Sequence, residues 1–461
     1  MLVLGIVIAG AAFVASFPSW LPRAIVAVRA RIFTRINGEE GIAIPGELVD
    51  ASHFKQIYSH PAANGRSRGA ALSDLFWYWL SPGPEIHQEH LEPGPRYEEV
   101  AQATRGVLAL PREAAEDLAA RCASRVLDEP RSPGTRLVRL RDVLMPVWAE
   151  FYHELVFGEP CTRLARELIV GHANDVVSAL KMCSLRHMQR RERLTRFLRS
   201  KIDSGGVKHE LPQCLSREEQ ALYLQGVFFN TAIVQMSEAM AHLLLALAHN
   251  PEVQARVIGD LEDDRYLDRV IAESLRAYPL FGIAHRITSA EIEVGPETTI
   301  PKGSVLCFNY LDYHNEGVLE PERFDPDRWE TLSARETNYI PFGVSANRPC
   351  PAQAIALVSM RIVARETLRR FSIHSTAAHT RSIPNRGPCI LVPRVGAQSA
   401  LLRYALLLFL RIRDRCEDVW RSFVQLALGT FMVWDARRLR LCQRYFETRE
   451  GACPLRTRKA R

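Results

Sequence analysis

One of the ten cysteines in this 461-residue chain stands where a thiol could serve as a metal ligand. Cys350 lies between Pro349 and Pro351, directly before a long stretch with the pattern of a helix. We expect Pro351 at the first helical position, where its missing N–H costs little. The N–H groups of Ala352 and Gln353 and the positive end of the helix dipole can then stabilise a thiolate. The alternative is a small buried apolar side chain, the state of most cysteines.

Two other patterns come before this cysteine. Glu273 and Arg276 lie three residues apart in "IAESLRAYP" and so share one face of a predicted helix. Alone, such a pair is common, and when exposed it is worth only about a few tenths of a kcal/mol. The segment "PERFDPDRW" (321–329) follows, and then the cysteine loop "FGVSANRPCPA" (342–352). The order and spacing of the three motifs are far more specific than any one of them.

Together the motifs resemble those of the cytochrome P450 superfamily, the haem-thiolate monooxygenases. The resemblance extends over roughly residues 40–394 and is strongest from Pro251 onward. It implies a mainly α fold with small β-sheets in a single large catalytic domain. It also implies haem b as the cofactor, with Cys350 as the axial thiolate that pushes electron density to favour O–O cleavage.

Further haem-binding residues are implied by the resemblance. Arg348 and Arg286 match two arginines that bind the haem propionates, with an ordinary surface arginine as the alternative for each. Another propionate contact is expected from an N-terminal helix, where His87, His90 and Arg96 are the candidates and the sequence does not separate them.

The resemblance also assigns a structural role to the earlier motifs. Glu273 and Arg276 are expected to join Arg323 in a buried charged triad that holds the fold beneath the haem. Such a set is structural, because removing one member leaves a buried charge unpaired.

The cysteine loop departs from the family pattern. Its aromatic residue, Phe342, lies eight residues before Cys350 rather than seven, and Ala346 stands where a glycine is usual. We interpret this as a one-residue enlargement of the loop, with Gly343 supplying the remaining flexibility. Haem binding is expected to survive, with a change in loop geometry and redox potential.

The long helix predicted from about 216 to 250 departs more seriously from the family pattern. Counting back from Pro251 places Val234 and Gln235 where the family has an acid and an alcohol that relay protons, and Thr231 at a small-residue position. Either Gln235 takes over this role with a water or a substrate group, or the enzyme does not use the usual oxygen cycle. Thr231 can take part in this proton relay only if the count of positions along the helix is off by about one helical turn. Alternatively, these polar residues merely bend or hydrate a buried helix.

The elements that must position these residues indicate one large, mainly helical body. The apolar fraction of 47% is ample for a core, and the cysteines form no CxxC pair, which argues against a disulfide framework or a zinc site. The 216–250 helix is apolar on nearly all sides and is expected to be buried. Helical patterns and short strands surround it: helices in 97–127 and 143–198, strands near 290–294, 298–300, 304–310 and 389–394.

The N-terminus is the first candidate membrane segment. Residues 1–22 carry no charged side chain, which suits a helix that crosses a bilayer with about 20 apolar residues. Arg23, Arg29, Arg31 and Arg35 follow and would place the catalytic domain in the cytoplasm. We expect an anchor over residues 1–22. A cleaved signal peptide and a helix packed on the body are the alternatives.

The C-terminal residues 395–461 form a basic, hydrophobic helical extension, with 14 Lys and Arg against 6 Asp and Glu. Its apolar runs at 400–415 and 423–434 are too short to span a bilayer. Both are flanked by arginines, which suits helices that lie on anionic lipid. A partner-docking hairpin and a cap on the body are the alternatives.

The function that the resemblance implies is oxidation of a small lipophilic substrate, such as a natural product of secondary metabolism. No flavin module fits in this length, so electrons are expected from a separate ferredoxin or reductase, and no nucleic-acid partner is expected. Two alternatives remain: an atypical enzyme of this fold (peroxygenase, isomerase or dehydratase) and a non-catalytic haem protein. The expected docking face for the electron donor contains Arg361, Arg365, Arg369 and Arg370.

Overall fold

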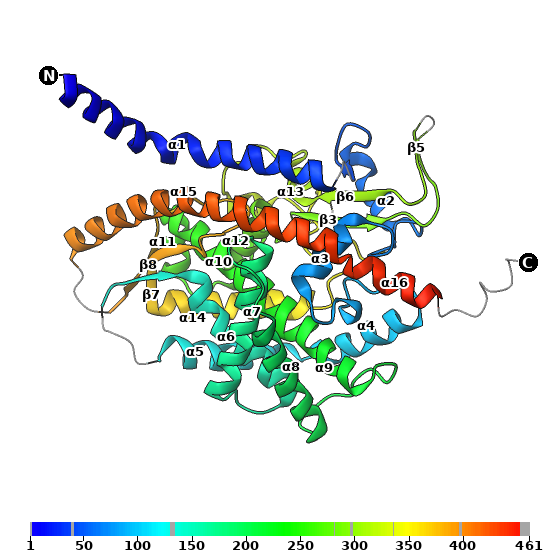
Figure 1. Cartoon of the computed structure of the whole chain (residues 1–461). Coiled ribbons are helices and arrows are strands. Elements are labelled where there is room, and N and C mark those ends of the chain that lie inside the picture. Colours follow the sequence, from blue (N-terminus) through cyan, green and yellow to red (C-terminus); the bar gives the residue numbers. More distant parts are fainter. Residues whose placement is uncertain are drawn as a thin grey trace, which may run out of the picture.

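The computed structural model describes residues 2–37, 41–129, 134–280, 282–295, 298–334, 336–395 and 399–451. Helices make up most of the molecule, and small sheets lie at its edges (Figure 1). The prediction of a mainly α fold with small β-sheets is confirmed.

The long central helix predicted near 216–250 is present, with one irregular segment. Ser216 caps its start: the Ser216 hydroxyl accepts the N–H of Glu219, and the Glu219 carboxylate accepts the N–H of Ser216. Leu243, Leu244 and Leu245 are fully buried, as expected of a helix that is apolar all round. The three segments are α9 (Arg217–Gly226), the π-helical η3 (Val227–Ala232) and α10 (Ile233–His249).

Other helices surround α10 and bury it. Trp148 and Phe151 on α6 are fully buried in the same hydrophobic core as the leucines of α10. Within the part of the chain that the structure describes, Arg217–His249 alone is long and apolar enough to cross a membrane, and 78% of its most apolar window is buried. The larger helices are α4 (Pro95–Leu108), α5 (Arg112–Leu127), α6 (Leu140–Phe157), α7 (Arg163–Leu180), α8 (Met188–Asp203) and α14 (Gln353–Arg370).

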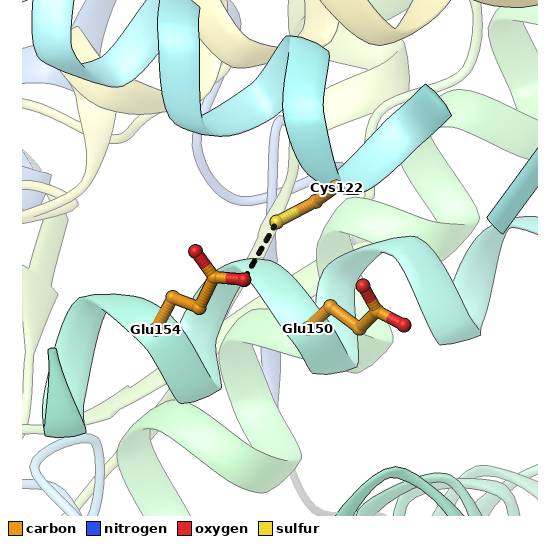
Figure 2. A group of neighbouring side chains, drawn as sticks. All are labelled: Cys122, Glu150 and Glu154. Atoms are coloured by element: carbon orange, nitrogen blue, oxygen red, sulfur yellow. Dashed lines mark hydrogen bonds between the residues drawn. The ribbon is translucent and has the colours of Figure 1, made fainter. Parts of the chain in front are cut away.

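Helices α5 and α6 are joined by a polar cluster, in which Figure 2 shows Cys122 facing Glu154 and Glu150. A thiol beside two carboxylates has the composition of a metal site. However, Arg125 pairs with both carboxylates, and Arg166 of α7 reaches Glu150 with an N–O distance of 2.8 Å. Because the arginines already balance the negative charge, the cluster is an ionic network that ties three helices together.

The sheets are short and carry parts of the site. In the first sheet β6 lies between β1, which is parallel to it, and β3, which is antiparallel; Arg286 on β3 is opposite Leu306 on β6. The other two sheets are antiparallel. The strands are β1 (Ile42–Ile44), β2 (Arg136–Arg139), β3 (Ile283–Ile287), β4 (Ile292–Val294), β5 (Thr298–Ile300), β6 (Val305–Asn309), β7 (Phe371–His374) and β8 (Pro388–Pro393).

Shorter helices connect these parts. Their bounds are α2 (Phe54–Ser59), α3 (Ala71–Leu80), α11 (Pro251–Gly259), α12 (Asp264–Ala277), α13 (Tyr310–Asn315), and the 3-10 turns η1 (Ala51–His53), η2 (Pro84–Ile86) and η4 (Pro326–Glu330).

The two terminal helices lie side by side along one face of the molecule (Figure 1). Arg29 Nη1 donates to Gln425 Oε1 at 3.1 Å. At Gly429 a Cβ would come within 3.0 Å of the Phe33 ring, so the glycine permits the close approach. The helix that starts in the predicted anchor therefore continues well beyond residue 22 and packs on the C-terminal extension. These helices are α1 (Leu2–Asn37) and α15 (Ala400–Leu439).

The extension also caps the body. Helix α16 (Leu441–Gly451) follows α15, and the Asp74 carboxylate on α3 accepts the backbone N–H groups of Cys442 and Gln443 at 2.9 and 3.2 Å. The Trp77 ring lies 5.2 Å from that of Tyr445.

Candidate haem-thiolate site

Cys350 faces an internal cavity of about 130 Å³. The cavity lies between the cysteine loop and the central helix, whose Thr231, Gln235 and Met236 line it. The Cys350 N–H donates to the carbonyl oxygen of Phe342 at 2.9 Å, which closes the loop around the thiol. The predicted loop residues Phe342 and Cys350 thus line one wall of the cavity, and the helix lines another.

The helix after the cysteine begins two residues later than the sequence suggests. Helix α14 starts at Gln353, with Ala352 as its N-cap, so Pro351 lies in the preceding turn rather than at the first helical position. Burial raises the pKa of the Cys350 thiol to about 11, and the Ala352 N–H opposes this shift. A buried thiol of this kind becomes a thiolate when a metal ion displaces its proton.

The cysteine loop is shaped by a second anchor that the sequence did not indicate. The Asn347 side chain donates to the carbonyl oxygens of Tyr58 and Ala63 at 2.6 and 3.0 Å. Gly343 has a φ of +79°, and Arg348 has a φ of +53°, an uncommon value for a residue with a side chain. The turn that brings Arg348 inward is therefore held by contacts to the distant segment 58–63.

Three arginines converge near the same cavity. Arg66, Arg286 and Arg348 surround Glu89, and burial together with the Arg286 charge lowers the pKa of Arg66 to about 9. Each arginine keeps a buried N–H donor with no partner in the described structure: Arg66 Nε, Arg286 Nε and Arg348 Nη2. The two nearby carboxylates, Glu89 and Glu92, do not balance three cations, so this corner of the cavity is suited to bind additional anionic groups.

The arginines are held by groups that sequence reasoning missed. Arg286 donates to the Tyr58 hydroxyl at 2.6 Å, and Arg348 donates to the Leu91 carbonyl at 2.7 Å and lies over the Tyr97 ring. Arg66 was missed as well, because it stands in a loop without a motif. Its place at the site is apparent only in the structure, where its carbonyl oxygen is hydrogen bonded to His285 on β3, more than 200 residues away in the sequence.

The three candidates for an additional anion contact are separated by the structure. His90 lines a second cavity, and His87 lines both cavities, where its Nε2 is hydrogen bonded to the Thr231 hydroxyl. Arg96 is not among the lining residues of either cavity, and its guanidinium pairs with Glu219 at 2.6 Å. His87 and His90 are therefore the better placed of the three candidates.

The predicted charged triad needs one correction. Glu273 and Arg276 are fully buried and share two N–O contacts of 2.9 Å, as expected. The third cation is Arg328, whose Nε lies 3.2 Å from Glu273, and the Trp329 indole donates to the same carboxylate. Arg323 was the wrong choice: its side chain is 67% exposed and pairs with Glu320. The segment 321–329 contains two arginines, and the sequence did not show which turns inward.

The predicted helix residues lie where the two cavities meet. The second cavity is about 160 Å³ and is bounded by Phe76, Val177, Leu180 and Val234 among others. Thr231 and Gln235 line both cavities, whereas Val234 lines the second. The residues common to both linings are His87, Glu89, Thr231, Gln235, Ala284 and Arg286.

The expected basic docking face is not free. Arg361 pairs with Asp264 and Asp268, and Arg365 pairs with Asp264 as well. Arg369 pairs with Glu262 and Arg370 pairs with Asp128, and both also pair with Glu366 on α14 itself. These four arginines therefore bind α14 to neighbouring helices, and their charge is largely balanced within the chain.

Comparison with known proteins agrees with this site. A family model described as Cytochrome P450 matches residues 163–399. A putative cytochrome P450 135B1 of Mycobacterium tuberculosis is 36% identical over 146 residues, 31% of this chain and 30% of that protein. Cyclooctat-9-en-7-ol 5-monooxygenase of Streptomyces melanosporofaciens is 31% identical over 173 residues, 32% of this chain and 37% of that protein. The matches thus span about a third of these curated relatives.

The fold is also shared with solved structures. CYP175A1 from Thermus thermophilus superposes with a TM-score of 0.59 at 20% identity, over 74% of this chain and 88% of that one. Because the family model covers half of the sequence, the chain belongs to the cytochrome P450 family. Members of this family bind haem through an axial cysteine thiolate and are in general monooxygenases.

The residues present fit haem. Haem needs a thiolate ligand for its iron and cations for its two carboxylates. The cavity offers the Cys350 thiol and the unpartnered N–H groups of Arg286 and Arg348, and Arg66 offers another from the lining of the second cavity. When bound, the haem supplies the redox-active iron, while this chain supplies the ligand, the counter-charges and an apolar enclosure.

Proposed function

We propose that this chain is a haem-thiolate monooxygenase that oxidises a lipophilic substrate, with Cys350 as the axial ligand of the iron. The observation that carries the proposal is the cavity that joins the Cys350 thiol to Arg286 and Arg348, whose buried N–H donors lack partners. Arg66, with another unpartnered donor, lines the adjoining cavity. Neither group alone would be specific, since most buried cysteines are inert and most arginines are paired. Their meeting in one cavity is explained by a ligand that needs both.

The second cavity is the proposed substrate chamber. Phe76, Val176, Val177 and Leu180 give it an apolar wall, and Thr231 and Gln235 line both this cavity and the first one. An apolar chamber with a few polar groups is typical of a site for a lipophilic small molecule. The relative from Streptomyces, by its name a monooxygenase of cyclooctat-9-en-7-ol, supports a natural product as the substrate class.

Gln235, Thr231 and Val234 are the proposed catalytic helix residues, and their chemistry is atypical. Within the described residues the Gln235 amide has no hydrogen-bond partner, so it is free to hold a water or a substrate group. Val234 can neither donate nor accept a proton. Proton delivery therefore depends on Gln235, Thr231 and bound water rather than on a carboxylate of this helix.

We also propose that the protein works at a membrane with a separate electron donor. The terminal helices expose large apolar side chains, among them Phe13 and Trp20 on α1 and Phe409 and Trp434 on α15. Exposed arginines such as Arg403 and Arg411 are interleaved with them. Apolar faces edged with arginine suit a lipid surface, and the predicted anchor at residues 1–22 belongs to the same layer.

The absence of a carboxylate at position 234 favours one alternative, an enzyme of this fold that uses peroxide rather than dioxygen. Purified holoprotein with a lipophilic test substrate should form an oxygenated product when dioxygen and a ferredoxin–reductase pair are supplied. A matched reaction with hydrogen peroxide and no electron donor should give less product. If product formed with hydrogen peroxide but not with dioxygen and the electron donor, the monooxygenase proposal would be contradicted, while the haem assignment would remain intact.

A further inference from the structure

Two sets of polar side chains line the proposed substrate chamber. One set is Arg66, Glu89, His90, His285 and Arg286, and the other is His87 with the helix residues Asn230, Thr231 and Gln235. The rest of its wall is built from aliphatic and aromatic side chains, and Thr231 and Gln235 also line the first cavity. In the described structure the side chains of Asn230 and Gln235 have no hydrogen-bond partner, and Thr231 has His87. A lipophilic molecule in this chamber would therefore meet uncharged hydrogen-bonding groups on the central helix.

His87 determines how the Thr231 hydroxyl is oriented. The backbone N–H of Glu89 donates to His87 Nδ1 at 3.2 Å, so Nδ1 is the acceptor of the ring and Nε2 carries the proton. Nε2 then donates to Thr231 Oγ1. With its oxygen accepting from His87, Thr231 is left with its own O–H to donate into the cavities.

Two local features of the backbone make this contact feasible. The segment Val227–Ala232 is π-helical, which places Thr231 out of the regular α-helical ladder. One turn earlier, a Cβ at Gly226 would lie 3.1 Å from His87 Cδ2, so the glycine gives the imidazole room to approach the helix. π-Helical segments and close glycine contacts occur frequently at functional sites.

We infer that the Thr231 hydroxyl, held by His87, is the docking point for an oxygen atom of the substrate, and that the substrate is a lipophilic molecule with one carbonyl-type oxygen. The free amide of Gln235 lies one turn further along the helix and can bond to the same oxygen or to an adjacent hydroxyl. This inference rests on the proposed function only in taking the second cavity as the substrate chamber.

A role for His87 as a proton source fits the geometry less well. Burial lowers the pKa of His87, with Glu89 opposing, so the ring is neutral at physiological pH. His90, also buried, faces His87 with a ring-centroid distance of 5.5 Å and supplies no negative charge. If neutral His87 gave up its Nε2 proton it would become an anion, whereas donating a hydrogen bond requires no change in charge.

The test uses a rigid pair of probes, 2-adamantanone and adamantane, which differ by one carbonyl oxygen. Their dissociation constants are measured on the haem-loaded protein from the shift of the haem absorption band, without dioxygen or an electron donor. We expect Thr231→Val to reduce the preference for the ketone about tenfold relative to wild type, because the carbonyl loses its donor. His87→Phe should reduce it as well, whereas Thr231→Ser should retain it.

His172→Phe is the matched control, since His172 on α7 is equally buried and lines neither cavity. It should leave the ketone preference unchanged. An unchanged preference in Thr231→Val, with a normal thiolate haem spectrum, would overturn the inference while leaving the proposed function intact. Loss of the haem spectrum in the wild type would instead contradict the proposed function.

Discussion

Charge balance around the cavity is the residue-scale feature that most strongly indicates its ligand. Arg66, Arg286 and Arg348 have two neighbouring carboxylates, Glu89 and Glu92, and the pKa of Arg66 falls to about 9 because of burial and the Arg286 charge. Since this value is above neutrality, the guanidinium is charged at physiological pH. A dianionic ligand would relieve the remaining repulsion among the three cations.

Replacing Arg66 should therefore weaken haem binding. For Arg66→Ala we expect haem to dissociate about tenfold faster or more, because a charge-assisted hydrogen bond to a buried carboxylate is lost. The transfer of haem to apomyoglobin measures this rate directly. Arg68→Ala is the control, because Arg68 is exposed two residues away. Equal rates for the two variants would show that Arg66 does not contact the haem.

The sequence was a good guide to residues that lie in motifs. Cys350, Glu273 and Arg276 could be selected because their spacing is specific. Arg66 and Tyr58 could not, because they lie outside any motif and acquire their roles only when the chain brings segments more than 200 residues apart together. The pairing of His87 with Thr231 was missed for the same reason, although each residue was a candidate on its own.

Among the elements, the contact between α12 and η4 is the most informative. Glu273 on α12 receives Arg276 from its own helix, and Arg328 and Trp329 from η4. These partners satisfy a fully buried carboxylate and fix the segment 321–329 beneath the site. The sequence predicted this contact between the two elements. It did not show which of the two arginines makes it, because a loop has no periodic pattern of buried and exposed positions.

Arg328→Ala is expected to destabilise the protein strongly. It removes one of the two cations of a buried carboxylate, which costs about 3–5 kcal/mol when a buried pair is broken. Arg323→Ala should change the free energy of unfolding by no more than about 0.5 kcal/mol, since its side chain is exposed. Urea unfolding of both variants gives the comparison. A reversed order would restore Arg323 as the third member of the triad.

The central helix shows which features of an element the hydrophobic pattern of the sequence can predict. Its bounds and burial were predictable from an apolar pattern that continues around the whole helix. The π-helical segment Val227–Ala232 was not, because one extra residue in a turn leaves the pattern of apolar residues almost unchanged. This irregularity rotates the side chains around the helix axis. It lies directly before Val234 and Gln235, which were assigned by counting residues back from Pro251.

For the whole molecule, the notable feature is that both ends of the chain form one layer. Helix α15 packs on α1 and on α3, and α16 is capped by Asp74 of α3. Deleting the extension would therefore uncover α3 as well as remove any lipid contact. Point substitutions on the exposed side of the layer give a cleaner test than truncation.

The double variant Phe431→Glu and Trp434→Glu should bind vesicles that contain phosphatidylserine about tenfold or more weakly than wild type, because burial of a large apolar side chain is worth about 1.5–3 kcal/mol. Both side chains are about half exposed on α15. Co-sedimentation measures the binding. Leu319→Glu is the control, since Leu319 is 83% exposed on another part of the molecule. Equal loss in both variants would mean that the terminal layer is not the lipid surface.

The most direct test of the account is the absorption spectrum of the reduced, carbon monoxide-bound protein, recorded for wild type and for Cys350→Ser with haem supplied during expression. Wild type is predicted to show the red-shifted Soret band of thiolate-ligated haem, and Cys350→Ser is predicted to lack this band. A wild-type protein that takes up no haem, or a Cys350→Ser variant that keeps the thiolate band, would contradict the assignment of Cys350 as the iron ligand.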